Sequence, residues 1–159
     1  MKTYIKSITS TAKHVVFMKE ALKEAIKAKE KDEVPVGCVI VHKDRIIARA
    51  HNQVETLKDP TAHAEMIAVT QAAAAAGSKW LQGAAVYVTI EPCVMCAGAL
   101  ILARIKQLIF GAKDPKAGAC GSVFDIPKEK NLNHRFSIKS GILEHDCSFL
   151  LTEFFRRKR

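Results

Sequence analysis

Three potential metal ligands at the starts of two predicted helices constrain the fold of this chain most strongly. Residues 64–76 are rich in alanine and stop at a glycine, a composition that predicts a helix. Residues 92–104 form a second apolar run, opened by a proline, which is favoured at the first helical position. His63 stands at the start of the first helix, and Cys93 and Cys96 share one face of the first turn of the second. If these three side chains bind one metal ion, the two helix starts must converge.

The three side chains have the spacing and chemistry of a catalytic zinc site. A catalytic zinc ion takes three protein ligands and keeps a fourth position for water, and His63, Cys93 and Cys96 would supply borderline-soft nitrogen and sulfur donors. Glu65 is the remaining carboxylate of the His-Ala-Glu motif. Because Glu65 is not needed as a ligand, we expect it to act as the proton shuttle of a hydrolytic reaction. The partial positive charge at both helix N-termini would lower the pKa of the two thiols.

Two other interpretations of these residues must be weighed. A lone Cys-x-x-Cys pair is also typical of a redox site, and a His-x-Glu pair is common by chance, but together at two helix starts they favour catalytic zinc. A closed structural zinc site would require a fourth ligand. Cys38, Cys120 and Cys147 could supply it but stand at no recognisable ligand spacing, so we expect them to be small core or loop residues.

The remaining pattern alternates helices and strands. It predicts a helix over 14–30, a hairpin of strands over 34–41 and 45–50, the helix over 64–76, a buried strand over 85–90, the helix over 92–104, a strand over 107–110, a Gly- and Ala-rich loop over 114–122, a short strand or irregular segment over 135–142, and a helix over 146–156. Such alternation predicts an α/β fold, a three-layer α/β/α sandwich with a central mixed sheet. Ligands bind at the carboxyl ends of strands in such folds, where the strand over 85–90 delivers Glu91, Pro92 and Cys93.

Length and composition fit one small domain. The chain has 159 residues, 48% of them hydrophobic, which suits a single domain over 1–159 with its own core. Five cysteines without a regular framework favour a reducing compartment, so we expect a cytoplasmic protein. The longest apolar stretch, residues 93–103, is too short to span a bilayer, so we expect no membrane association through a span. We expect residues 1–13 to form a flexible N-terminal extension, although the basic start of the chain has a faint likeness to a transit peptide.

The charge of the chain predicts a polyanionic partner. The formal net charge is +9, and nucleic acid is the natural candidate for such a surface. The chain ends in two phenylalanines and four cations, at residues 154–159, and two interpretations of this end stay open. The aromatic side chains could stack on unpaired bases while the cations neutralise phosphates. Alternatively, the segment is a basic helix end whose charges complement the helix dipole while both phenylalanines pack in the core.

Several segments resemble a known family. The zinc motif is similar to that of the cytidine-deaminase-like zinc deaminases, and within that group the chain resembles the bacterial-type tRNA-specific adenosine deaminases, the TadA family. The segments that carry this likeness begin at Glu33 (EVPVGCVIVH), Asp59 (DPTAHAEM), Thr89 (TIEPCVMCAGALILARI), Phe110 (FGAKDPKAGACGS), Asn131 (NLNHR) and Gly141 (GILEHDCSFLLTEFFRRKR). Together they span roughly residues 14–159, and the segments outside the zinc motif are the more specific ones.

The resemblance implies a reaction, its partners and its site residues. It implies zinc-dependent hydrolytic deamination of the wobble adenosine to inosine in a tRNA anticodon stem-loop, with one zinc ion per subunit, a homodimer, and no DNA as natural substrate. It assigns His63, Cys93 and Cys96 as zinc ligands, Glu65 as the proton shuttle, Asn52 and the backbone of Ala64 as contacts of the flipped base, Asp114 and Lys116 to a loop near the target nucleotide, and Phe155 and Arg156 to a terminal helix that touches the anticodon loop.

Two rival functions share the same motif. One is deamination of a free nucleobase or nucleoside such as guanine, cytosine or cytidine, against which the charge of +9 and the basic tail argue. The other is a noncatalytic RNA-binding or partner subunit that has kept the fold, against which the intact Glu65 argues. Taken without the resemblance, Asn52 is typical of a turn after a strand, and Asp114 followed by proline is typical of a turn as well.

Overall fold

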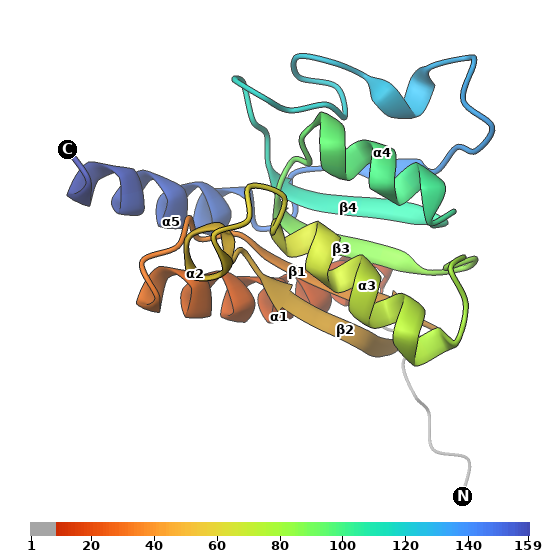
Figure 1. Ribbon diagram of the computed structural model, residues 1–159, viewed down its shortest axis with the longest axis horizontal. Helices are drawn as coiled ribbons and strands as arrows, with labels where there is room; N and C mark the ends of the chain where they lie inside the picture. Colours follow the sequence, from red (N-terminus) through yellow and green to blue (C-terminus); the bar gives the residue numbers. More distant parts are fainter. Residues whose placement is uncertain (1–8) are drawn as a thin grey trace, which may run out of the picture.

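A five-stranded mixed sheet forms the centre of the protein (Figure 1). The computed structural model describes residues 9–159. The strands are β1 (Gly37–His42), β2 (Arg45–His51), β3 (Ala85–Ile90), β4 (Gln107–Ala112) and β5 (Ser137–Lys139). Their order in the sheet is β2-β1-β3-β4-β5; β1 is antiparallel to both of its neighbours, whereas β3, β4 and β5 are parallel.

Helices cover both faces of this sheet (Figure 1). The long helices are α1 (Ser10–Glu30) and α5 (Glu144–Arg157) on one face, and α3 (Ala64–Ala76) and α4 (Val94–Leu102) on the other. Two short elements, α2 (Val54–Leu57) and the 3-10 helix η1 (Ile126–Lys128), lie in the connections. The predicted three-layer α/β/α sandwich with a mixed sheet is therefore confirmed.

Alternate residues of β3 supply the two hydrophobic cores. Val86 and Val88 pack in one buried cluster with Leu100 of α4, whereas Tyr87 packs in a second cluster with Met18 of α1. Successive side chains of a strand point to opposite faces, so a strand covered on both sides must be apolar at nearly every position. This requirement explains why the segment over 85–90 is apolar except at Thr89, whose hydroxyl accepts a hydrogen bond from the backbone N–H of Gly37 (3.1 Å).

The first helix begins four residues earlier than the sequence predicts. α1 starts at Ser10 because the hydroxyl of Thr9 accepts a hydrogen bond from the backbone N–H of Ala12 (3.3 Å) and caps the helix. Residues 10–13, predicted as part of a flexible extension, thus belong to α1, and residues 1–8 lie outside the described part of the chain. None of the helices within residues 9–159 is long and apolar enough to cross a bilayer.

The second site helix is shorter than predicted. α4 begins at Val94 with Cys93 as its N-cap, so Pro92 precedes the helix instead of opening it. The helix stops at Leu102, because Arg104 takes a left-handed backbone conformation (φ 57°). Elsewhere, β1 begins three residues later than predicted, β4 extends two residues further, and α5 begins two residues earlier. α2 and η1, of four and three residues, are too short to show an apolar period and were not predicted.

Candidate active site

The starts of α3 and α4 bring three metal-binding side chains together. His63 is the N-cap of α3, Cys93 is the N-cap of α4, and Cys96 lies in the first turn of α4. The Nδ1 atom of His63 is 3.7 Å from Sγ of Cys93 and 3.6 Å from Sγ of Cys96. Neither N-cap side chain hydrogen-bonds to its own helix, so both face the cluster. The predicted convergence of the two helix starts is present.

The geometry of this cluster fits zinc. Bonds of about 2.05 Å to nitrogen and about 2.3 Å to sulfur, at a tetrahedral angle, place the two ligand atoms about 3.6 Å apart. The observed separations of 3.6 and 3.7 Å agree with this value. Cys38, Cys120 and Cys147 are buried, and none of them joins the cluster, which is the one metal-binding group found among residues 9–159. The site therefore suits one zinc ion per subunit with an open fourth position.

Hydrogen bonds within the cluster place negative charge on Cys93. The Cys96 thiol and the His63 ring both hydrogen-bond to its sulfur and lower the pKa of Cys93 to about 4. The N-terminus of α4 begins at the same residue and adds partial positive charge there. Cys93 is therefore a thiolate at neutral pH, which is the form of cysteine that binds zinc.

Glu65 lies beside the cluster as the second residue of α3. Its side chain is buried, and burial raises the pKa of the Glu65 carboxyl above its ordinary value. Glu65 is not a member of the metal-binding group. A carboxyl group with a raised pKa that borders an open metal position is suited to accept and return protons near neutral pH.

A cavity of about 720 Å³ opens in front of these side chains. His63, Glu65 and Cys93 line it, and so do Asn52 and Ala64. The volume is that of a typical small-molecule site, large enough for a nucleobase with room beside it. The structure thus brings the residues assigned to the metal, to proton transfer and to base contact into one cavity.

Asn52, which lines this cavity, carries a buried acceptor that is unpaired in the described part of the chain. The residue is 6% exposed, and its backbone N–H donates to the carbonyl of Val36 (3.0 Å), but its Oδ1 has no hydrogen-bond partner among residues 9–159. Buried polar atoms are nearly always paired, and an unpaired one costs about 1–3 kcal/mol. An unpaired acceptor in a cavity wall marks a point where a ligand can donate a hydrogen bond.

The loop that follows β4 forms one side of the cavity rim. Asp114 and Lys116, both predicted site residues, line the cavity. The Oδ1 atom of Asp114 accepts hydrogen bonds from the backbone N–H groups of Lys116 (2.9 Å) and Ala117 (3.1 Å) and so fixes the turn. Lys116 itself is exposed. Asp114 therefore shapes the loop, while Lys116 brings a free cation to the rim.

The end of α5 forms another part of the rim. Phe155 is 47% exposed and lines the cavity together with Lys158 and Arg159. Phe154 is buried and meets Phe155 edge to face, with ring centroids 5.4 Å apart. Arg156 lines an adjoining hollow of about 440 Å³ instead of the main cavity. Phe154 thus packs in the core, as the second interpretation predicts, whereas Phe155 is exposed beside the cavity and its stacking on a base stays a prediction.

Two buried glutamates stabilise the segments that line the cavity, and no sequence motif predicts this role. Glu33 accepts hydrogen bonds from two backbone N–H groups of α2 (3.1 and 2.5 Å), and Glu91 accepts them from Cys120 and Ser122 (both 3.2 Å). Both glutamates line the cavity, but their carboxylate oxygens accept hydrogen bonds from the protein backbone. The only signal in the sequence is the place of Glu91 between a buried strand and a Pro-Cys pair.

Comparison with known proteins agrees with this geometry. Residues 11–112 match the family described as the cytidine and deoxycytidylate deaminase zinc-binding region, a segment that contains the whole metal cluster, Glu65 and Asn52. The protein is thus a zinc-dependent deaminase by both its fold and its site.

The relatives narrow the class. The tRNA-specific adenosine deaminase of Bacillus subtilis (strain 168) is 49% identical over 144 residues, 91% of this chain and 89% of that protein. A solved structure from work on A-to-I editing by tRNA:A34 deaminases at the wobble position of transfer RNA has a TM-score of 0.83 and 44% identity, covering 86% of this chain and 99% of that one. A guanine deaminase structure from Bacillus subtilis has a TM-score of 0.62 and 35% identity over 76% of each chain. The chain belongs to the tRNA-specific adenosine deaminase family.

Proposed function

We propose that this protein hydrolyses the wobble adenosine of a tRNA anticodon loop to inosine. The observation that carries the proposal is the composition of the cavity: its lining includes His63 and Cys93 of the metal cluster, Glu65, Asn52 with its unpaired Oδ1, and an exposed aromatic ring with cations. Such a cavity suits a base turned out of an RNA loop, with its neighbouring phosphates at the rim. The identity with tRNA-specific adenosine deaminases supports the same substrate.

The residues of the site divide the work of the reaction. His63, Cys93 and Cys96 hold zinc, which when bound supplies a Lewis acid that activates water at neutral pH. Glu65 takes a proton from the attacking water and delivers it to the ring nitrogen of adenine, which makes the amino-bearing carbon electrophilic. In a second transfer Glu65 takes the remaining proton of the new hydroxyl group and delivers it to the exocyclic amine, so that ammonia leaves and the carbon keeps the oxygen as a carbonyl. Adenosine and water thus yield inosine and ammonia.

Asn52 and the rim select and hold the target nucleotide in this proposal. The amide of Asn52 offers its unpaired Oδ1 to a donor on the base, and the backbone of Ala64 lies in the same wall. Phe155 offers a stacking face, while Lys116 and Arg159, which line the same cavity, attract the phosphates of the RNA. Turning a base out costs least in an unpaired loop such as the anticodon.

We further propose that two copies of the chain associate through the outer face of α4. Val94 and Leu102 of α4 are 46% and 77% exposed, and Val123 and Phe124 of the connection that follows β4 are 46% and 51% exposed. α4 and this connection form one outer side of the molecule in Figure 1. Large exposed apolar side chains on one side of a molecule favour a protein partner. Sedimentation of the parent protein and of Leu102→Glu tests this: a dimer is expected for the parent and a monomer for the variant, and an equally dimeric Leu102→Glu would contradict the assignment.

A substrate comparison tests the reaction. The purified zinc-loaded protein is incubated with an anticodon stem-loop RNA carrying a wobble adenosine, and separately with free adenosine, guanine, cytosine and cytidine. Inosine in the RNA, with no comparable turnover of the free compounds, is the expected result. Deamination of a free base or nucleoside without any inosine in the RNA would replace the proposal with the small-molecule reaction. RNA binding without turnover of any substrate would indicate a noncatalytic partner subunit.

A further inference from the structure

Asn52 lies at the edge of the sheet, where hydrogen bonds hold its backbone and that of Gln53, but no described residue pairs with its side-chain Oδ1. It directly follows β2, which is the edge strand of the sheet and pairs with β1 alone. On the sheet side, the backbone N–H of Asn52 bonds to Val36. A displacement of about 1 Å in a group that orients a substrate can cost roughly 100-fold in rate, so an amide that reads a base requires a firmer hold than this.

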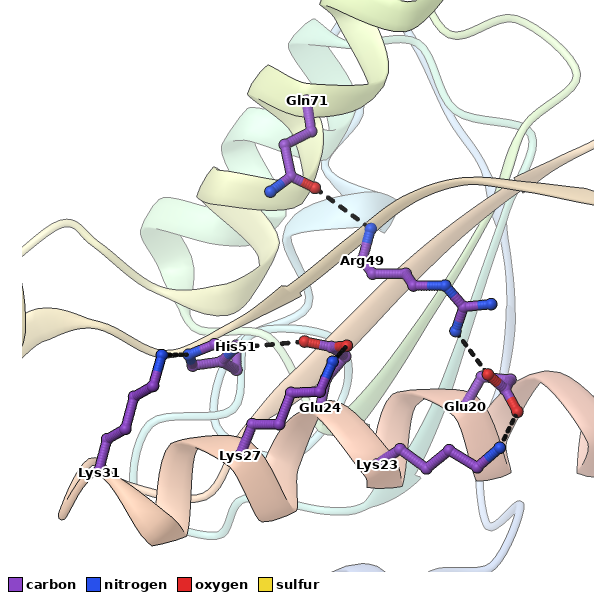
Figure 2. A network of polar contacts seen from close by, with 8 residues as sticks. All are labelled: Glu20, Lys23, Glu24, Lys27, Lys31, Arg49, His51 and Gln71. Atoms are coloured by element: carbon purple, nitrogen blue, oxygen red, sulfur yellow. Dashed lines mark hydrogen bonds and ion pairs between the residues drawn. The ribbon is translucent and has the colours of Figure 1, made fainter.

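The neighbouring residue, His51, supplies that hold through α1 (Figure 2). Its ring is buried, with Nδ1 3.2 Å from Oε2 of Glu24 and Nε2 3.4 Å from Nζ of Lys31. The Glu24 side chain is 5% exposed and also accepts a hydrogen bond from Lys27 (2.6 Å). A carboxylate of α1 and the end of β2 are thus joined in the interior, 27 residues apart in the sequence.

Gly37 allows α1 to come close enough for this contact. Gly37 pairs with His51 in the register of β1 and β2. A Cβ atom at this position would lie 1.9 Å from the backbone oxygen of Ala21 and 2.9 Å from the Cβ atom of Glu24. α1 therefore rests directly on the first residue of β1, and Glu24 reaches the ring of His51 from that point.

The donors and acceptors of the contact are determined by chemistry. An ammonium group can only donate hydrogen bonds, so Nε2 of His51 accepts a hydrogen bond from Lys31. The ring hydrogen is therefore on Nδ1, and this N–H group donates a hydrogen bond to Glu24. Burial acts to raise the pKa of Glu24, but hydrogen bonds from Lys27 and His51 outweigh it and hold the pKa below its ordinary value. The carboxylate is thus charged at neutral pH and forms the stronger, charge-assisted kind of hydrogen bond. The ring cannot flip without losing both contacts.

We propose that Glu24 and His51 form a positioning pair that fixes the amide of Asn52 against the substrate base. The proposal rests on the proposed function, in which Asn52 contacts the target adenine. Neither Glu24 nor His51 lines the cavity, so the pair acts through Asn52 and not on the substrate itself. Its expected effect is on substrate affinity and base selectivity, with the metal cluster left intact.

The same face of α1 offers a matched control (Figure 2). Glu20 bonds to Arg49 of β2 and to Lys23, one turn before Glu24 on the helix. This contact is more exposed, with side-chain exposures of 23% for Glu20 and 46% for Arg49. Glu20→Gln therefore removes a carboxylate from the same helix–strand interface but leaves the contact between Glu24 and His51 in place.

A double-mutant cycle tests the proposal. Single-turnover kcat/KM for inosine formation in the RNA is measured for the parent, His51→Phe, Asn52→Ala and the double variant, with zinc content and melting temperature recorded for each. We expect His51→Phe to keep one zinc per chain and to lower kcat/KM about tenfold, mainly through KM. In the Asn52→Ala background the same change is expected to have less than a twofold effect, because residues acting through one another are not additive. His51→Asn, whose side-chain amide can donate from the position of Nδ1, is expected to restore most of the loss.

Each outcome of the cycle decides the question. An equal loss from His51→Phe in both backgrounds, or a loss below twofold in the parent background, would overturn the positioning role. If His51→Phe does not fold, the same double-mutant cycle is measured with Glu24→Gln. This change is expected to lower kcat/KM threefold in the parent background and not at all in the Asn52→Ala background. Glu20→Gln is expected to match the parent, and a loss equal to that of Glu24→Gln would also overturn the proposal. An inactive parent would overturn the proposed function and this inference with it, whereas an active parent with an insensitive His51 overturns the inference alone.

Discussion

The Nδ1 atom of His63 lies 3.6 Å from the Sγ atom of Cys96, although the two residues are 33 positions apart in the sequence. The contact exists because α3 and α4 lie side by side on one face of the sheet and begin at the same end. Each helix contributes its N-cap residue and its N-terminal partial charge to the metal cluster. The zinc site thus depends on the packing of two helices on one sheet. Loss of the ligand from α3 or of the ligands from α4 is expected to destabilise the packing of both helices.

Removal of zinc is therefore expected to destabilise the whole domain. With free zinc about 1,000-fold above its dissociation constant, binding contributes about 4 kcal/mol. Each kcal/mol changes the melting temperature of a chain of this size by about 2–4 °C, so chelation is expected to lower it by about 8–16 °C. Calorimetry with and without a chelator measures this, and Cys96→Ala should melt at the chelated temperature and bind no zinc. Equal melting temperatures with and without the metal would contradict a site built from both helices.

Gly118→Ala is expected to disturb the loop at the cavity rim. A Cβ atom there would lie 2.0 Å from Oε2 of Glu91 and 2.5 Å from the backbone oxygen of Asp114. Overpacking of this kind typically costs about 1–3 kcal/mol. Gly98→Ala in α4 is the control, because nothing lies within 4 Å of its added Cβ and alanine favours the helix. Urea unfolding should show a loss only for Gly118→Ala, and a stability equal to that of the parent would contradict the close approach of Glu91 to this loop.

Substitutions of the two phenylalanines at the end of α5 are expected to have different effects, one on stability and the other on RNA binding. Phe154 is buried, so Phe154→Ala is expected to cost about 3 kcal/mol of unfolding free energy. Phe155 lines the cavity and is 47% exposed, so Phe155→Ala is expected to leave the stability within about 0.5 kcal/mol and to weaken RNA binding by about 1–3 kcal/mol. Thermal melting and RNA titration of the two variants measure this separation. Equal RNA affinity for the parent and Phe155→Ala would remove the stacking role.

Glu33 is expected to contribute stability that depends on pH. Burial acts to raise its pKa, but hydrogen bonds from Thr56 and Glu55 outweigh it and hold the pKa of Glu33 below the ordinary value of 4.5. A lowered folded-state pKa means that the contribution is fully present above pH 4.5 and is lost as the pH falls through the folded value. Urea unfolding of the metal-free protein should show Glu33→Gln to be about 1–2 kcal/mol less stable than the parent at pH 7, with the gap closing in acid. A gap that is constant with pH, or one shared by the exposed Glu30→Gln, would contradict this role.

Local patterns were sufficient to predict the catalytic cluster. α3 and β3 have the predicted bounds, because a run of helix formers ending in glycine and a nearly continuous apolar run depend little on the rest of the fold. His63, Cys93 and Cys96 occupy helix starts, where spacing along the chain already restricts their directions. The assignment of Asn52 depended on family resemblance, since an asparagine after a strand is otherwise a turn residue.

Tertiary contacts that no local pattern contains account for the rest. Glu24 and Glu33 look like surface acids in the sequence, and Glu91 is marked only by its place at a strand end. The packing of α1, α2 and the loop after β4 turns all three into buried acceptors. The helix start at Ser10 depended on one capping hydroxyl, and the end of α4 on one left-handed backbone angle. Phe154 and Phe155 are adjacent and chemically identical, and only the orientation of α5 distinguishes the core residue from the exposed one.

The central claim is that Glu65 moves protons for a zinc-dependent attack on the wobble adenosine. The most direct test is to incubate a tRNA transcript bearing a wobble adenosine with the parent protein and with Glu65→Ala, both loaded with one zinc per chain, and to sequence the product. We predict inosine at the wobble position alone with the parent, and a rate at least about 100-fold lower with the zinc-bound variant. Near-parental inosine formation by Glu65→Ala, or an unmodified tRNA after incubation with the parent, would contradict the account.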